Sequence, residues 1–184
     1  MSKIIGERGD KTRRDRYREK VATAKTFPIS ITTVNFRQEV NLAYVVRAAV
    51  CFGAEEVCVI GSYPSRKIMN ELSGSLFDYI KVRAWPTPSD YIRYAERNDI
   101  GLVSIEIPPA GFEYHSILDY KFDFSKRICL VVGHETLGVP VEILAKSDII
   151  FIPMDGAGFC LNTAQAANIA LYEATKRYKE EVQG

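Results

Sequence analysis

The sequence is short of the residues from which metal sites and disulfide frameworks are built. Its 184 residues include only two histidines and four cysteines, and neither a CxxC nor an HExxH pattern occurs. A zinc site requires three or four protein ligands, so we expect no metal site. The four cysteines are interpreted as buried reduced thiols, in preference to metal ligands or disulfides: Cys51, Cys58, Cys129 and Cys160.

Long apolar runs are also missing. No stretch approaches the roughly 18 consecutive apolar residues that a membrane-spanning helix needs. The N-terminal segment MSKIIGERGDKTRR lacks the apolar centre of a secretory signal. With 47% hydrophobic and 26% charged residues, the composition is typical of a folded globular protein and not of a disordered one. We therefore expect a cytoplasmic protein with no membrane partner.

Phosphate-binding glycine patterns are absent too. A Walker loop ends in Gly-Lys followed by Ser or Thr, a dinucleotide fingerprint reads G-x-G-x-x-G, and neither occurs here. This absence disfavours an α/β nucleotide-binding protein of these two classes. In the segment GHETLG, Gly133 would let a ligand approach the backbone closely, and Gly138 would allow a left-handed turn.

The small net charge of +1 conceals an uneven distribution. Residues 1–25 carry nine basic and four acidic side chains, whereas residues 26–184 carry fifteen basic and nineteen acidic ones. A basic N-terminal extension ahead of a mildly acidic domain is typical of nucleic-acid binding. The same charges would also suit a solvated amphipathic helix in which arginines pair with Asp15 and Glu19, and charge alone leaves both interpretations open.

From Phe27 onward the chain alternates short apolar runs with helical patterns, which predicts an α/β fold. The sheet should be mostly parallel, with helices on both faces, because several runs are almost continuously hydrophobic and β-branched. The expected strands are Ile29–Val34, Glu56–Ile60, Tyr79–Arg83, Gly101–Ile105, Ile128–Val132 and Ile149–Ile152. The expected helices are Glu39–Phe52, Ser65–Ser73, Ser89–Arg97, Pro140–Lys146 and Thr163–Lys179.

Ligands of such sheets bind beyond the carboxyl ends of the strands, which draws attention to the loops after Ile105, Val132 and Ile152. Glu135 could accept backbone N–H groups of its own loop, a structural role at least as well supported as catalysis. Asn162 stands where a helix begins, and its simplest role is that of a cap. Taken alone, Arg47 would extend from its apolar helix to reach water.

Three segments, taken in order, change this interpretation. They are N-x5-R-A-A-x2-F-G at Asn41–Gly53, V-V-G-x-E-x2-G at Val131–Gly138, and I-P-M-x5-C-L-N at Ile152–Asn162. Together they resemble the three motifs of the SpoU (TrmH-type) RNA ribose methyltransferases of the SPOUT class, over roughly residues 27–178. Three ordered motifs at compatible spacing are far more specific than one.

The resemblance implies an S-adenosylmethionine-dependent enzyme that methylates a ribose 2′-hydroxyl of transfer or ribosomal RNA. It implies a SPOUT-type fold with a C-terminal trefoil knot over residues 26–184, and a homodimer with the cofactor site near the subunit interface. By motif position, the cofactor pocket should be lined by Ile105, Gly133, Ile152, Cys160 and Leu161.

Catalytic positions follow from the same motifs. Arg47 and Asn162 should face the reacting ribose, while Asn41 and Glu135 should hold the site in shape, with Glu135 near Arg47. A free guanidinium stays protonated, so we expect Arg47 to bind a phosphate and stabilise the developing alkoxide. His134 is not a motif position. In the basic extension, residues 1–25, the expected RNA contacts are Arg13, Arg14, Arg16 and Arg18.

Two positions depart from the family pattern. The usual serine before Leu-Asn is Cys160, and a second small hydroxyl is replaced by Ala164. A thiol is a weaker hydrogen-bonding group than a hydroxyl, so a catalytically inactive RNA-binding dimer on the same fold is the alternative function. The presence of Arg47, Glu135 and Asn162 favours an active enzyme.

Overall fold

The computed structural model describes residues 13–108 and 110–183, which form a seven-stranded sheet in the order β3-β2-β1-β6-β4-β7-β5. All six strand pairs in this sheet are parallel. The strands are β1 (Ile29–Val34), β2 (Glu56–Ile60), β3 (Lys81–Trp85), β4 (Ile100–Ile105), β5 (His115–Ser116), β6 (Arg127–Val132) and β7 (Asp148–Phe151). The expected parallel α/β sheet is thus confirmed.

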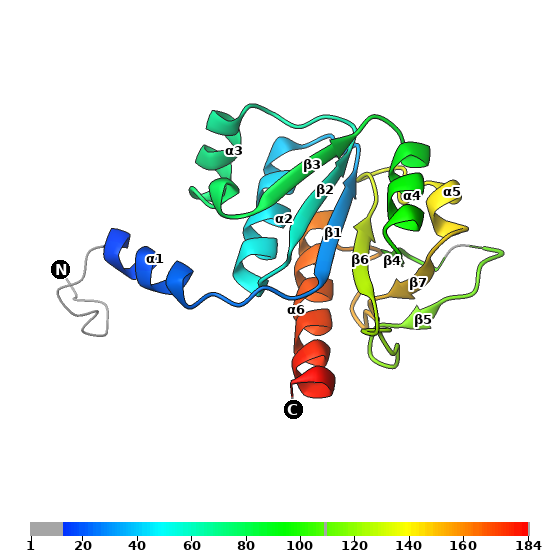
Figure 1. Ribbon diagram of the computed structural model, residues 1–184. Coiled ribbons are helices and arrows are strands. Elements are labelled where there is room, and N and C mark those ends of the chain that lie inside the picture. Colours follow the sequence, from blue (N-terminus) through cyan, green and yellow to red (C-terminus); the bar gives the residue numbers. More distant parts are fainter. Residues whose placement is uncertain (1–12, 109, 184) are drawn as a thin grey trace.

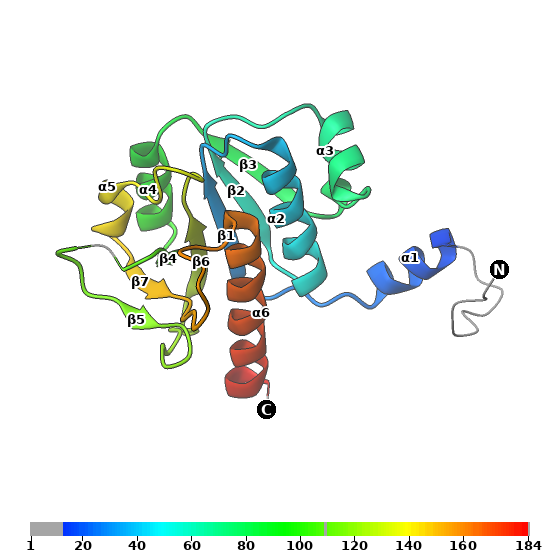
Figure 2. The ribbon, with the colours of Figure 1, turned by 180° about the vertical axis from the view of Figure 1, so that it is seen from behind.

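Helices cover both faces of the sheet. The helices of the described residues are α1 (Arg13–Ala22), which lies off the sheet, α2 (Glu39–Phe52), α3 (Arg66–Ser73), α4 (Pro88–Arg97), α5 (Val141–Leu144) and α6 (Thr163–Val182), with a short 3-10 helix η1 (Phe77–Tyr79). Helices α2, α3 and α6 lie on one face, and α4 and α5 on the other (Figures 1 and 2). Because the strands are parallel, the loops that follow them gather along one edge.

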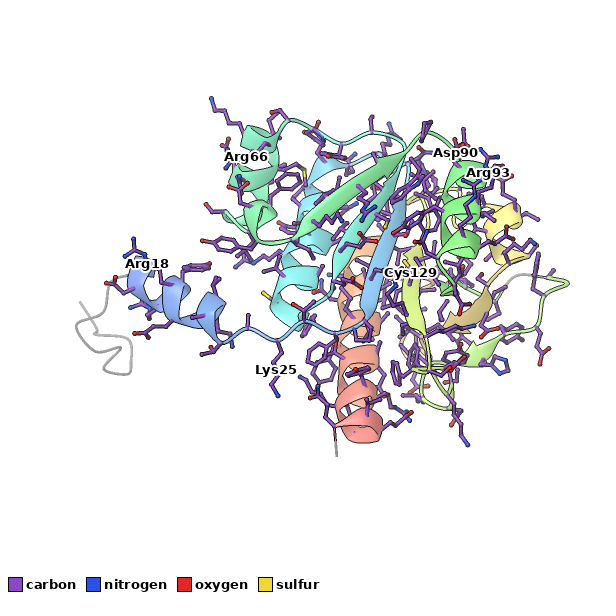
Figure 3. All side chains as sticks on the ribbon, viewed as in Figure 1. Arg18, Lys25, Arg66, Asp90, Arg93 and Cys129 are labelled. Atoms are coloured by element: carbon purple, nitrogen blue, oxygen red, sulfur yellow. The ribbon has the colours of Figure 1, made fainter. Side chains whose placement is uncertain are left out.

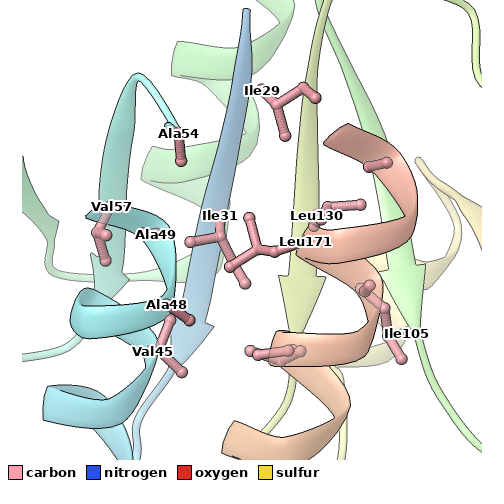
Figure 4. Close-up of a cluster of buried hydrophobic side chains, with 14 of the residues drawn as sticks. Ile29, Ile31, Val45, Ala48, Ala49, Ala54, Val57, Ile105, Leu130 and Leu171 are labelled. Atoms are coloured by element: carbon pink, nitrogen blue, oxygen red, sulfur yellow. The ribbon is translucent and has the colours of Figure 1, made fainter. Parts of the chain in front are cut away.

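The larger of two hydrophobic clusters lies between the sheet and the helices α2 and α6, and the other packs under α4 and α5. Every residue of β1 is buried, and small side chains on both helices let them approach the sheet and one another closely. Figure 4 shows Ile31 of β1 and Leu171 of α6 meeting in this layer, with Val45 and Ala48 of α2 beside them. The packing fixes where α2 and α6 begin, and both begin at the edge that carries the strand-following loops.

Several elements differ from the sequence-based prediction. Strand β3 starts at Lys81 instead of Tyr79, because residues 77–79 form η1 ahead of it. Strand β5 was not predicted, since two residues are too few for an alternating pattern. The expected helix at Pro140–Lys146 is only the four residues of α5.

The cysteine interpretation was wrong at two of four positions. Cys58 and Cys129 are buried, and burial raises the pKa of both thiols, whereas Cys51 and Cys160 are exposed. Cys51 lies on the outer side of α2, and Cys160 lies in the loop between β7 and α6. Figure 3 labels Cys129, which lies on β6. No group of three or more candidate metal ligands occurs among residues 13–108 and 110–183.

Within the basic extension, residues Arg13–Ala22 form α1, which stands apart from the sheet and is joined to β1 by an extended segment (Figure 1). The ring of Tyr17 stacks on that of Tyr79 with centroids 6.2 Å apart. Arg18 is exposed on this helix (Figure 3). The side chains of Arg13 and Arg14 lie outside the described part of the protein, as does the whole segment 1–12.

Candidate functional site

A cavity of about 820 Å³ lies at the carboxyl ends of β4, β6 and β7. Its walls are the loop after β4, the turn after β6 and the loop that leads from β7 to α6. The structure brings together the five residues expected to line one pocket, since all of them line this cavity: Ile105, Gly133, Ile152, Cys160 and Leu161. That these five residues bind a cofactor stays a prediction.

The turn after β6 depends on two glycines. A Cβ atom on Gly133 would lie 2.1 Å from the carbonyl carbon of Gly138 and 2.3 Å from the nitrogen of Val139. Gly138 itself has φ +69, and a Cβ there would lie 2.5 Å from Oε2 of Glu106. The turn therefore folds back onto the end of its own strand, which only glycine permits at these two positions. The left-handed turn expected at Gly138 is confirmed.

Glu135, in this turn, ties the cavity wall to the start of α2. Its Oε2 accepts the backbone N–H of Arg37 (2.9 Å), and its Oε1 accepts the N–H of Gln38 (3.1 Å). The side-chain amide of Asn41 donates to the same Oε1 (2.8 Å). The partners Arg37 and Gln38 precede α2, and Asn41 lies in its first turn. The backbone N–H of Glu135 also donates to the carboxyl, so Glu135 holds its own loop against the start of α2.

These hydrogen bonds also set the charge of Glu135. Partial burial acts to raise the pKa of Glu135, but the N–H of Arg37, the amide of Asn41 and the N–H of Gln38 outweigh it and hold the pKa below its ordinary value. All of these partners donate to the carboxylate form, so they stabilise the ionised state. Glu135 is therefore ionised at neutral pH.

Asn162 links the same network to the start of α6. Its Oδ1 accepts the N–H of Ala164 (2.9 Å), which confirms the expected helix cap. Its Nδ2 donates to Oδ1 of Asn41 (3.1 Å). Nearby, the hydroxyl of Thr163 donates to the carbonyl oxygen of Gly133 (3.1 Å). The amide and carboxylate groups thus join three segments at one side of the cavity.

Arg47 is the predicted catalytic residue that forms none of the hydrogen bonds of this network. It is exposed on α2, and its guanidinium approaches Gly74, where a Cβ would lie 3.2 Å from Nη1. Within the described residues Arg47 forms no ion pair with Glu135, and it does not line the cavity. Six residues along a helix are about 9 Å of rise and 240° of rotation, which separates Arg47 from Asn41. That Glu135 lies near Arg47 stays a prediction.

Sequence reasoning missed Glu106, which lines the cavity at the end of β4. Its Oε2 accepts the N–H of Val139 (2.8 Å), and its Oε1 accepts the N–H of Ile107 (2.9 Å). It therefore holds the β4 loop against the turn after β6. The available signal was an acidic residue directly after a buried strand, although this pattern has many other uses.

The Glu135 network predicts a pH-dependent stability. The pKa of Glu135 is lowered on folding, so its contribution is present above the ordinary value of 4.5 and is lost as pH falls through the folded value. Glu135→Gln should reduce the free energy of unfolding at pH 7 by up to about 2 kcal/mol. Urea denaturation should show this difference shrinking below pH 4.5. Glu142→Gln, at an exposed position on α5, is the control; a Glu135→Gln deficit that is constant with pH would contradict the assignment.

The comparisons with known proteins agree with this geometry. Residues 28–172 match the model of the SpoU rRNA Methylase family. The chain is 30% identical over 143 residues to a 23S rRNA (uridine(2479)-2′-O)-methyltransferase of Streptomyces viridochromogenes, covering 74% of this chain and 48% of that protein. It is 23% identical over 138 residues to a tRNA (guanosine(18)-2′-O)-methyltransferase of Escherichia coli K12, covering 74% and 58%. The chain thus spans about half the length of these relatives.

Solved structures share the fold. The A. aeolicus TrmH/SpoU tRNA modifying enzyme superposes with a TM-score of 0.75 at 22% identity, covering 90% of this chain and 83% of that one. The SpoU methyltransferase AviRb from Streptomyces viridochromogenes, in complex with AdoMet, gives 0.71 at 22% identity, covering 90% and 65%. Because the family model takes in residues 28–172 of 184, this chain belongs to the SpoU rRNA Methylase family.

Proposed function

We propose that the protein transfers the methyl group of S-adenosylmethionine to a ribose 2′-hydroxyl of transfer or ribosomal RNA. One observation carries the proposal: a cavity lined by all five residues that the family motifs assign to the cofactor has the Asn41–Glu135–Asn162 network at its side. Relatives named as 2′-O-methyltransferases of transfer and ribosomal RNA support the substrate class.

The cavity suits this cofactor in size and chemistry. About 820 Å³ lies within the range of small-molecule sites, and the wall combines apolar side chains with a few polar groups. Ile105, Ile152 and Leu161 supply apolar surface for an adenosine moiety. Gly133 contributes backbone to the wall, but the space where its Cβ would lie is taken by the turn at Gly138 and Val139 and not left to a ligand. When bound, S-adenosylmethionine supplies an electrophilic methyl group and leaves as a neutral thioether.

The reaction then depends on orienting the ribose and on removing the proton of its 2′-hydroxyl. The leaving group requires no protonation, so positioning of the 2′-hydroxyl supplies much of the rate. Both Glu135 oxygens already accept hydrogen bonds, so Glu135 acts by holding the β6 turn and α2 in place. Asn162 is exposed beside the cavity, where its amide can contact the ribose.

The position of Arg47 away from the cavity is explained by a second subunit. Arg47 is exposed on α2, and the adjacent helices α2 and α6 also expose apolar side chains, including Tyr44 (48%), Ile169 (40%) and Tyr172 (56%). We take this face to form the contact of a homodimer, which would place Arg47 at the subunit interface. There it would bind an RNA phosphate and stabilise the developing alkoxide.

The alternative function is a catalytically inactive RNA-binding dimer. It rests on Cys160 and Ala164, which replace the usual hydroxyls. Cys160 lines the cavity, while Ala164 is buried and bonds through its backbone N–H to the Asn162 cap. Calorimetric titration with S-adenosylmethionine separates the two functions.

We also place the protein in the cytoplasm and expect a trefoil knot in the segment from β6 to α6.

The proposed function predicts the chemical position of the methyl group in the RNA product. With labelled S-adenosylmethionine and unmodified RNA, label should appear on ribose, and the phosphodiester on its 3′ side should resist alkali. Alkaline cleavage requires a free 2′-hydroxyl, so resistance reports the modified atom directly. Nucleotide analysis after alkaline digestion checks this, and label confined to the bases would exclude ribose methylation.

The second prediction concerns Arg47. Arg47→Ala should reduce turnover about 100-fold or more, as expected when one transition-state stabiliser is removed. Affinity for S-adenosylmethionine should change little, because Arg47 does not line the cavity. Sedimentation of the variant shows whether the dimer persists. Turnover close to that of the wild type would remove Arg47 from the reaction.

A further inference from the structure

A second arginine, Arg37, stands at the edge of the site in the β1–α2 connection. The backbone on each side of it is fixed. Asn35 has φ +44, and its Oδ1 fills the space above Gly61, where a Cβ would lie 2.3 Å away. Phe36 packs against the main hydrophobic core. The Cα of Arg37 therefore has a defined position relative to the sheet.

The same backbone is bonded directly to the site. The N–H of Arg37 donates to Oε2 of Glu135 (2.9 Å), and the N–H of Gln38 donates to Oε1 (3.1 Å). Glu135 lines the cavity, whereas Arg37 does not. The carboxylate of Glu135 thus lies between Arg37 and the cavity, and the side chain of Arg37 is exposed to solution.

The guanidinium of Arg37 is available to a ligand. Its side chain is exposed and forms no hydrogen bond or ion pair within the described part of the chain. The adjacent Glu135 carboxylate is already occupied by backbone and amide donors. Glu39, two residues further on, is exposed and forms no ion pair with it. An arginine on a rigid base beside an active site, with no internal partner, is suited to bind an external anion.

We propose that Arg37 binds a backbone phosphate of the RNA next to the target nucleotide and so positions its ribose at the cavity. The inference rests on the proposed function. A guanidinium matches a phosphate with two parallel hydrogen bonds, and a fixed base limits the conformations that binding must restrict. The anion belongs to the RNA and not to the cofactor carboxylate, because Arg37 lies outside the cavity wall. Arg37 is a positioning residue in this account.

The test compares Arg37→Ala and Arg37→Lys with Arg97→Ala. Arg97 is also an exposed arginine, but it ends α4 just before β4 begins, at the opposite edge of the sheet. Alanine at position 37 keeps the backbone N–H that Glu135 accepts, so the network should survive, and urea denaturation checks this. RNA affinity is measured against salt concentration, S-adenosylmethionine affinity by calorimetry, and turnover at saturating RNA.

Arg37→Ala should weaken RNA binding roughly five- to tenfold and flatten the plot of log affinity against log salt by about 0.7 to 0.9 units, one phosphate contact. Arg37→Lys should keep most of the salt slope while recovering only part of the turnover, since lysine keeps the charge but not the planar donor pair. Arg97→Ala should match the wild type in all three measurements.

Two results would overturn the inference. One is an Arg37→Ala salt slope equal to that of Arg97→Ala while the wild type binds RNA normally. The other is a loss of S-adenosylmethionine affinity in Arg37→Ala, which would assign Arg37 to the cofactor. If the wild type itself binds no RNA, the proposed function fails, and this outcome is distinguishable because it precedes any comparison of variants.

Discussion

The candidate site depends on the hydrogen bonds that the carboxylate of Glu135 accepts. Glu135 lies in the turn after β6, and it accepts hydrogen bonds from Arg37, Gln38 and Asn41, almost a hundred positions earlier in the sequence. Through Asn41 the contact extends to Asn162, which caps α6. One ionised side chain therefore links the turn after β6 to the start of α2 and, through Asn41, to the start of α6. These segments carry the three family motifs.

This arrangement decides what kind of role Glu135 has. A general base must have an oxygen free to receive a proton from the substrate, and it performs best with a pKa near the working pH. Both oxygens of Glu135 accept hydrogen bonds, and its pKa is shifted downward, away from neutrality. The geometry thus gives Glu135 a positioning role, because its carboxylate fixes the β6 turn and the start of α2 beside the cavity.

The sequence predicted the α/β sheet because buried parallel strands are almost continuous apolar runs that stand out from amphipathic helices. It predicted the cavity lining through motif position, which places Ile105, Gly133 and Cys160 together although they are far apart in the chain. It could not predict the direction in which Arg47 points, since helix rotation is set by packing against α3 and α6. Glu106 and Arg37 were missed because single charged residues after strands carry no distinctive spacing.

The central claim is that S-adenosylmethionine occupies the cavity, and the two exposed thiols allow a direct measurement. Cys160 lines the cavity and Cys51 does not, while Cys58 and Cys129 are buried. Alkylation by iodoacetamide, followed by mass spectrometry of the peptides, gives a separate rate for each thiol. Saturating S-adenosylmethionine should slow the modification of Cys160 and leave that of Cys51 unchanged. A Cys160 rate that is the same with and without the cofactor would contradict the account.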